Sequence, residues 1–313
     1  NPNHGPSTLH VTTGSQFPGS ASVGSWVSYG LGTENQDMPA YMVIQDPRGA
    51  PVNGGHVWGN GYLPAAYQGT LLRNEGTPIL NLDLPRGLSR KRQRSELDQL
   101  RLLNQRFSSR FPDSTELEAR IESYELAYRM QSRAPELVDI SDEPEHVRKL
   151  YGLDNGATAA FGRQCLMARR LAESGVRYTM LVHGVQISAS SWDDHGDVHA
   201  HKKPAALSDQ PVAALLTDLK ARGMLDETLV VWGGEFGRTP TAQGGGRDHH
   251  PYGFSMWLAG GGVRRGMTYG ATDEFGFFAV DNQVHIHDLH ATILHLLGLD
   301  HEQLTYRYSC LLY

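Results

Sequence analysis

Segments with helical spacing of apolar residues alternate with short apolar runs along the second half of the chain. Their order is helix Thr158–Ser174, strand Val176–Val182, helix Ala205–Arg222, strand Thr228–Trp232, strand Phe254–Leu258 and helix His287–Leu297. The first two helices end at Gly175 and Gly223, and glycine favours a helix C-cap. This alternation predicts an α/β fold with a mostly parallel sheet. The carboxyl ends of such strands form a ligand crevice, so the polar segments after them are candidates for chemistry.

The first part of the chain has a weaker pattern. Ser22–Leu31 predicts a short helix, and Ala40–Ile44 predicts a strand that ends at the turn signal Asp46-Pro47. Residues 1–20 and 47–87 are rich in turn-forming residues, and we interpret both as loop.

A change of composition marks an insertion. Between Leu88 and about Arg133 glycine is missing and Leu, Glu, Arg and Gln dominate, with Ser114 as the expected cap of a second helix. This pattern predicts a helical hairpin. We therefore expect a single α/β domain over residues 1–313 with a helical insertion at 88–150, which would serve either as a lid over the crevice or as a docking surface.

Charge and composition exclude several classes of protein. Lys and Arg number 28 against 34 Asp and Glu, for a net charge of −6, and Arg90–Arg94 is the main basic run. Nucleic-acid binding requires a concentrated basic surface, so we expect no nucleic-acid partner. No apolar run approaches the ~18 residues of a membrane span, and no signal peptide is recognisable. The two cysteines are far apart and form no metal motif.

The polar segment Trp192–His201 follows one predicted strand. Three carboxylates and three imidazoles lie within nine of its residues, and it contains no thiolate ligand. Oxygen and nitrogen ligands of this kind suit Zn, Mn, Fe or Ni. Asp193 and His195 are the preferred ligands, because His199 and His201 adjoin two lysines and favour the surface. The alternative is a solvated loop before a helix.

Two glycine-rich segments flank the next predicted strands, one after the strand Thr228–Trp232 and one before the strand Phe254–Leu258. In Gly233–Pro240, Glu235 offers a carboxylate at a strand end, and the fork of Arg238 suits phosphate or sulfate oxygens. In Gly244–Pro251, Asp248 stands beside His249, as when a carboxylate orients a ligand imidazole. The alternatives are a Glu–Arg pair that braces the loop and a histidine bonded to backbone.

Two further segments are less specific. His285–His295 has the pattern of an amphipathic helix, and we expect most of its histidines to be structural. Asn3–Leu9 offers the hydroxyls of Ser7 and Thr8 at a helix start, which is a ready anion site, or is simply the end of the chain. No dinucleotide fingerprint, Walker loop or hydrolase elbow occurs.

Taken in order, these motifs resemble the bacterial sulfatase-like family known as domain of unknown function 1501, in the alkaline-phosphatase superfamily. The resemblance covers nearly the whole chain. It is carried by Gly24–Gly32, Trp192–Gly196, Gly223–Val231, Glu235–Pro240, Gly246–His249, Gly270–Glu274 and Asp288–His301.

The resemblance implies a doubly wound α/β fold with a metal site at the carboxyl edge of its sheet. The implied metal ligands are Asp193, His195, Glu235 and His249, with Asp248, His250, Arg247 and His4 as additional candidates. The ion would be divalent (Zn, Mn, Ca or Fe), and Ser7 or a water would attack an ester whose anion is bound by Arg238 or Arg247. An extracytoplasmic location is implied by the resemblance alone.

Three departures from the family pattern matter. The N-terminal strand with its metal carboxylate is absent from this sequence, Phe236 stands where a histidine is frequent, and His4 and Thr8 replace the sulfatase Cys and Arg. The leading expectation is a metal-dependent hydrolase of phosphate or sulfate esters, acting on small molecules or polysaccharides. The alternatives are a non-catalytic binding or scaffold protein and a phosphotransferase or mutase. The sequence leaves the oligomeric state open.

Overall fold

The computed structural model describes residues 1–313 except 74–77, 81, 109–114, 185–191, 310 and 313. Its central sheet has three parallel strands in the order β2-β1-β3. These strands are β1 Tyr41–Ile44, β2 Thr70–Leu72 and β3 Tyr178–Leu181. All four residues of β1 are buried, as expected for a strand that is covered on both faces. The strands predicted at 40–44 and 176–182 are present, and the structure pairs them in parallel.

The other described strands form two-stranded antiparallel ladders. These are β4 Val230–Trp232 with β7 Trp257–Ala259, β5 Gly237–Arg238 with β6 His249–His250, β8 Ala271–Thr272 with β9 Ala279–Asp281, and β10 Arg307–Tyr308 with β11 Leu311–Leu312. The last predicted strand therefore begins three residues later than Phe254 and runs antiparallel to its neighbour. A doubly wound, mostly parallel sheet of sulfatase type stays a prediction.

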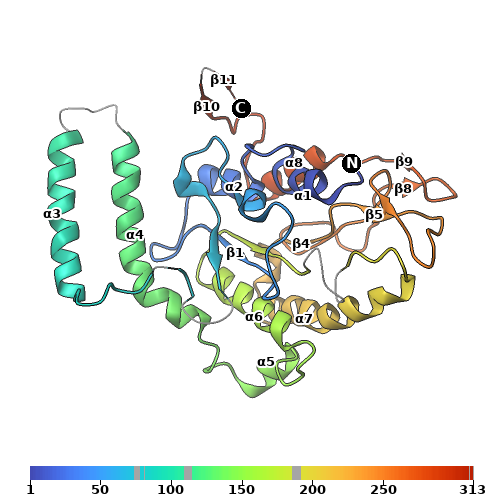
Figure 1. Ribbon diagram of the computed structural model, residues 1–313, viewed down its shortest axis with the longest axis horizontal. Helices are drawn as coiled ribbons and strands as arrows, with labels where there is room; N and C mark the ends of the chain where they lie inside the picture. Colours follow the sequence, from blue (N-terminus) through green and yellow to red (C-terminus); the bar gives the residue numbers. More distant parts are fainter. Residues whose placement is uncertain (74–77, 81, 109–114, 185–191, 310, 313) are drawn as a thin grey trace.

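Helices cover both sides of these strands (Figure 1). On one side lie α6 Ala159–Glu173 and α7 Lys202–Ala221, with the short α5 Glu145–Leu150 beneath them; on the other lie α1 His4–Thr13, α2 Val23–Leu31 and α8 Ile286–Leu296. Short 3₁₀ turns occupy Gly54–Trp58, Ala65–Tyr67, Val198–His201 and Leu225–Glu227.

The helix α1 corrects the interpretation of residues 1–20 as loop. Its start has the signals of a helix, because Asn3 is the N-cap and Pro6 falls in the first turn, where its missing N–H costs nothing. Gly14 ends the helix in the left-handed conformation, with φ of 77°. Gly175 and Gly223 have φ of 87° and 72°, in agreement with their predicted capping role.

The largest buried core lies between the sheet and the α6–α7 side. Met42 and Ile44 of β1 pack there with Leu166 and Leu171 of α6 and with Leu219 of α7. A second group of buried side chains joins α2 to α8 through Val27 and Ile293. A third group packs Leu9 of α1 against Tyr41 and Val43 of β1, and these cores together fix β1, β3 and α1, near whose ends the candidate site lies.

The insertion is a helical hairpin, α3 Arg90–Ser108 and α4 Thr115–Val138. It projects from the body at the end opposite to β5 and the N-terminus (Figure 1). Met130 and Ala134 of α4 are buried in the main core, and Arg94 of α3 pairs with Glu125 of α4. The predicted cap Ser114 lies outside the described residues. Among helices in the described part of the chain, none has the length and apolar character that a membrane crossing needs.

Candidate metal centre

Three segments far apart in the sequence bring five side chains together. His4 comes from the first turn of α1, Asp193 and His195 from the segment before α7, and Glu235 and His249 from the stretch between β4 and β7. We call these five residues the histidine–carboxylate cluster. They include the four predicted ligands and one of the additional candidates, so sequence and structure select overlapping sets.

Asp193 lies at the centre of the cluster. Its Oδ1 is 2.9 Å from Nε2 of His249 and 3.0 Å from Nε2 of His195, and its Oδ2 is 2.9 Å from Nε2 of His4. The Nη2 of Arg238 donates to Oδ1 at 2.7 Å. Burial alone would raise the pKa of Asp193, but the hydrogen bonds from His249, Arg238 and His4 outweigh it and hold the pKa well below its usual range. The carboxylate is therefore ionised and strongly attracts cations.

The tautomer of His249 is fixed by the backbone. Its Nδ1 lies 2.6 Å from the carbonyl oxygen of Pro2, and a carbonyl accepts only, so Nδ1 carries the proton and donates. The other ring nitrogen, Nε2, faces Oδ1 of Asp193 and Nε2 of His195. Three such atoms that converge in this way can share a proton or a metal cation. An Nδ1–H that donates to a carbonyl while Nε2 binds is common among metal-ligating histidines.

His4 stands between two carboxylates. Its Nδ1 is 2.5 Å from Oε1 of Glu235, and its Nε2 contacts Asp193 as described. The hydrogen bond with Glu235 is the largest influence and raises the pKa of His4, although burial opposes it. Burial tends to raise the pKa of Glu235, but the bond from His4 lowers it. The raised pKa favours protonated His4, whose positive charge lies between the carboxylates of Glu235 and Asp193. A metal ion could take the place of this charge.

Two overlapping sets of side chains have the spacing of metal ligands among the described residues around this site. One is His4, Asp193 and His249, and the other is His195, Asp248 and His249. His249 belongs to both. Asp248 is half exposed, and its Oδ1 accepts the N–H of His249 at 2.8 Å and lies 3.6 Å from Nδ1 of His195. Imidazole and carboxylate ligands without thiolate fit a divalent ion such as Zn or Mn.

The remaining predicted residues have other partners. Arg238 donates to Asp193 and to the carbonyls of Trp192 and Arg247, and exposed Arg247 donates to the carbonyl of Thr239. His250 is buried against the rings of Tyr252 and Phe277 and belongs to neither ligand set. Ser7 is buried, and its hydroxyl donates to the carbonyl of Asn1 at 2.5 Å.

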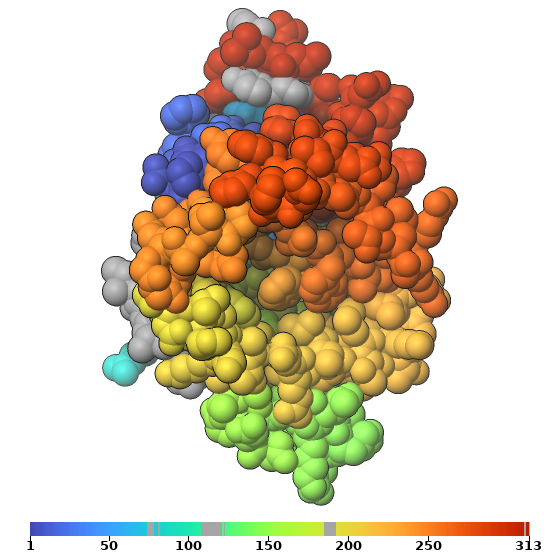
Figure 2. All heavy atoms as spheres, turned by 90° about the vertical axis from the view of Figure 1, so that its right-hand side faces the viewer, coloured from blue at the N-terminus to red at the C-terminus, as the bar shows by residue number. Residues whose placement is uncertain are grey.

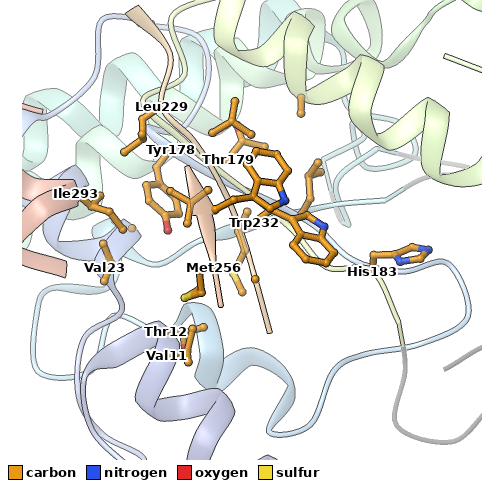
Figure 3. A pocket seen from close by; sticks show the side chains of 18 of the residues that line it. Val11, Thr12, Val23, Tyr178, Thr179, His183, Leu229, Trp232, Met256 and Ile293 are labelled. Carbon is orange, nitrogen blue, oxygen red and sulfur yellow. The ribbon is translucent and has the colours of Figure 1, made fainter. Parts of the chain in front are cut away.

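A large cavity adjoins the cluster. Its volume is about 1110 Å³, and its lining includes His4, Asp193, Glu235 and Arg238. Figure 2 shows the side of the molecule that lies on the right in Figure 1, where a hollow is framed by the yellow to orange segments. Figure 3 shows its inner wall, where Tyr178 and Thr179 of β3, Trp232 of β4 and Met256 contribute side chains. The cavity is apolar inside and charged at the cluster, which is the usual character of a ligand pocket.

The resemblance places His4 at the nucleophile position of sulfatases and among the additional ligand candidates. In the fold it is the contact between Asp193 and Glu235. The helix signals at Asn3, Pro6 and Gly14 would have placed it at the start of a helix. Asp46, predicted only as a turn residue, is also buried at the carboxyl ends of β1 and β3, where it accepts the N–H of Gly184 at 2.8 Å.

Comparison with known proteins gives one match. Residues 1–311 match the model of a family described as "Protein of unknown function (DUF1501)". No curated protein and no solved structure is a significant match.

Proposed function

The chain belongs to the DUF1501 family, and we propose that it is a divalent-metal-dependent hydrolase of phosphate or sulfate esters. The observation that carries this proposal is the geometry of the histidine–carboxylate cluster. Nε2 of His249 and Nε2 of His195 converge on Oδ1 of ionised Asp193, and His4 joins Asp193 to Glu235. Such a set holds Zn, Mn, Ca or Fe by its oxygen and nitrogen donors.

The residues of the site would have different roles. His4, Asp193, His195 and His249 would hold the ion, with Glu235 and Asp248 beside them. When bound, the ion would polarise the ester oxygen and acidify a water. Arg238 positions Asp193 through its 2.7 Å hydrogen bond. The hydroxyl of Ser7 is held by the carbonyl of Asn1, which favours water over Ser7 as the attacking group.

The broader setting is part of the same proposal. We place the family in the alkaline-phosphatase superfamily by resemblance, with a doubly wound sheet, an ester of a small molecule or polysaccharide as substrate, and an extracytoplasmic location. All residues of β3 and of β4 line the one cavity, and each strand has a strand partner on one side only among the described strands.

A second function has one observation in its favour. The ring of Phe236 packs against His249 and His4, with centroid separations of 4.2 and 5.0 Å, and so fills space where another imidazole would be needed for a second ion. A non-catalytic protein that binds a metal but turns over no ester would keep this arrangement. Ester turnover distinguishes the two functions.

The test combines metal content with turnover. Elemental mass spectrometry of the purified chain and of Asp193→Ala and His249→Ala is expected to show a bound ion in the wild type and at least about a tenfold weaker affinity in each variant. Nitrophenyl phosphate and nitrophenyl sulfate report hydrolysis by the same samples. The control is His146→Ala, an exposed histidine on α5.

The outcomes distinguish the hydrolase from the non-catalytic metal-binding protein. Metal binding with hydrolysis that both variants lose supports the hydrolase. Metal binding without any hydrolysis in the wild type supports the non-catalytic alternative. Equal metal content in wild type, Asp193→Ala and His249→Ala would refute the proposed centre.

A further inference from the structure

A second group of imidazoles lies at the other end of α1. His10 in the last turn of α1 faces His285, the N-cap of α8, and His287, the second residue of that helix. The ring centroids of His10 are 5.3 Å from His285 and 6.0 Å from His287, and the latter two are 4.7 Å apart. We call these residues the three-histidine cluster. None of them belongs to the candidate metal centre.

The cluster has the composition and spacing of a transition-metal site. One nitrogen from each ring lies within 4.8 Å of the other two. In a tetrahedral site with metal–nitrogen bonds of about 2.0–2.1 Å, ligand nitrogens are roughly 3.4 Å apart. His285 and His287 are exposed, so small rotations of their rings can close this difference.

The hydrogen bonds around the rings leave ligand nitrogens available. Nε2 of His287 lies 2.9 Å from the carbonyl of Gly14 and must donate to it, which leaves the lone pair of Nδ1 for an ion. His10 is half-buried, and in the described part of the chain neither of its ring nitrogens has a hydrogen-bond partner.

His285 has one competing contact. Its Nδ1 accepts the N–H of His287 at 3.2 Å, so binding an ion through Nε2 would move the ring proton and cost this long hydrogen bond. The other half of the helix cap is independent of the ring, because Asp288 accepts the backbone N–H of His285 at 2.7 Å. The start of α8 therefore remains capped when the imidazole binds an ion.

We propose that the three-histidine cluster binds a divalent transition metal such as Zn and clamps the end of α1 to the start of α8. The two helices already meet there, because His290 of α8 lies 2.8 Å from the carbonyl of Val11 and must donate to it. His4 and His10 are six residues apart on one helix, about 9 Å along its axis. A clamp at His10 would therefore restrain the helix that carries His4.

Zinc binding to the full chain tests this site separately from the candidate metal centre. After equilibrium dialysis against micromolar Zn, we expect His10→Ala and His287→Ala each to hold about one equivalent less per chain than the wild type. Asp193→Ala keeps this equivalent, whether or not the proposed hydrolase centre exists. His295→Ala, an exposed histidine on the same helix, is the matched control and binds like the wild type.

A second measurement needs no variant. Diethyl pyrocarbonate modifies accessible histidines, and peptide mass spectrometry shows which ones react. We expect Zn to reduce the modification of His10, His285 and His287 at least about fivefold while His295 reacts as before. Zinc content unchanged by both substitutions, or modification of the three histidines unchanged by Zn, would overturn the proposal.

Discussion

At the scale of single residues, a buried carboxylate joins the ends of two neighbouring strands. Asp46 follows β1 and is 1% exposed. Its Oδ1 accepts from Nε of Arg48 at 2.8 Å, and its Oδ2 accepts from the N–H of Gly184 after β3. Burial would raise the pKa of Asp46, but these hydrogen bonds together lower it. One carboxylate therefore holds together the carboxyl ends of two parallel strands.

Asp46 should make the protein sensitive to acid. Its folded pKa is below the unfolded value, so its contribution to stability is complete above about pH 4 and is lost as the pH falls through the folded pKa. Asp46→Asn should lower the free energy of unfolding by about 1.5–3 kcal/mol at pH 7, and this difference should shrink toward pH 2. Urea unfolding at several pH values measures it, with exposed Asp209→Asn as control. A difference that does not change with pH would contradict the expectation.

At the scale of elements, the hairpin of β5 and β6 depends on close approach of two backbones. Arg238 of β5 pairs with His249 of β6, which places both beside Asp193. A Cβ added at Gly246 would lie 2.5 Å from the backbone carbon and oxygen of His195. Only glycine permits this contact without displacing the segment that carries two members of the histidine–carboxylate cluster.

Gly246→Ala should therefore disturb the site through the backbone. We expect a loss of about 1–3 kcal/mol in stability and at least about tenfold in metal affinity, because His195 must move away from His249. Gly156→Ala is the control, since its added Cβ would meet nothing within 4 Å. Calorimetric unfolding and metal titration measure both effects. Wild-type metal affinity in Gly246→Ala would show that this contact does not position the ligands.

At the scale of the whole molecule, the hairpin α3–α4 and the histidine–carboxylate cluster occupy opposite ends (Figure 1). The cluster lies by β5 and the start of α1, whereas α3 is attached to the body through α4. A lid must reach the site that it closes, so this arrangement favours the docking interpretation of the insertion over the lid.

Hydrogen exchange can check this separation. With Zn and inorganic phosphate added together, exchange should slow in the first turn of α1 and in the hairpin of β5 and β6, where the predicted ligands lie. Exchange in α3 and α4 should not change, because no described contact links them to the cluster. Slower exchange in α3 or α4 when phosphate is present would restore the lid interpretation. A sample with Zn but no phosphate shows which part of the protection comes from metal binding and which from anion binding.

The sequence by itself determined the local elements with strong periodicity and the residue types of the site. Helices α6, α7 and α8 and strands β1, β3 and β4 lie within a few residues of their predicted bounds, because apolar periodicity and glycine caps act over short distances. Asp193, His195 and Glu235 were recognisable because each lies in a polar segment after a strand, and His249 because it lies in a glycine-rich polar segment beside Asp248.

The tertiary structure decided which of these residues meet. His4 and Glu235 are 231 positions apart, and His10 and His285 are 275 apart, so no local pattern could pair them. Whether Ser7 faces the site or the carbonyl of Asn1 depends on how α1 packs. The local sequence supplies the candidate ligands. Only the packing of α1 between distant segments brings His4, at its start, and His10, near its end, next to the other candidate ligands.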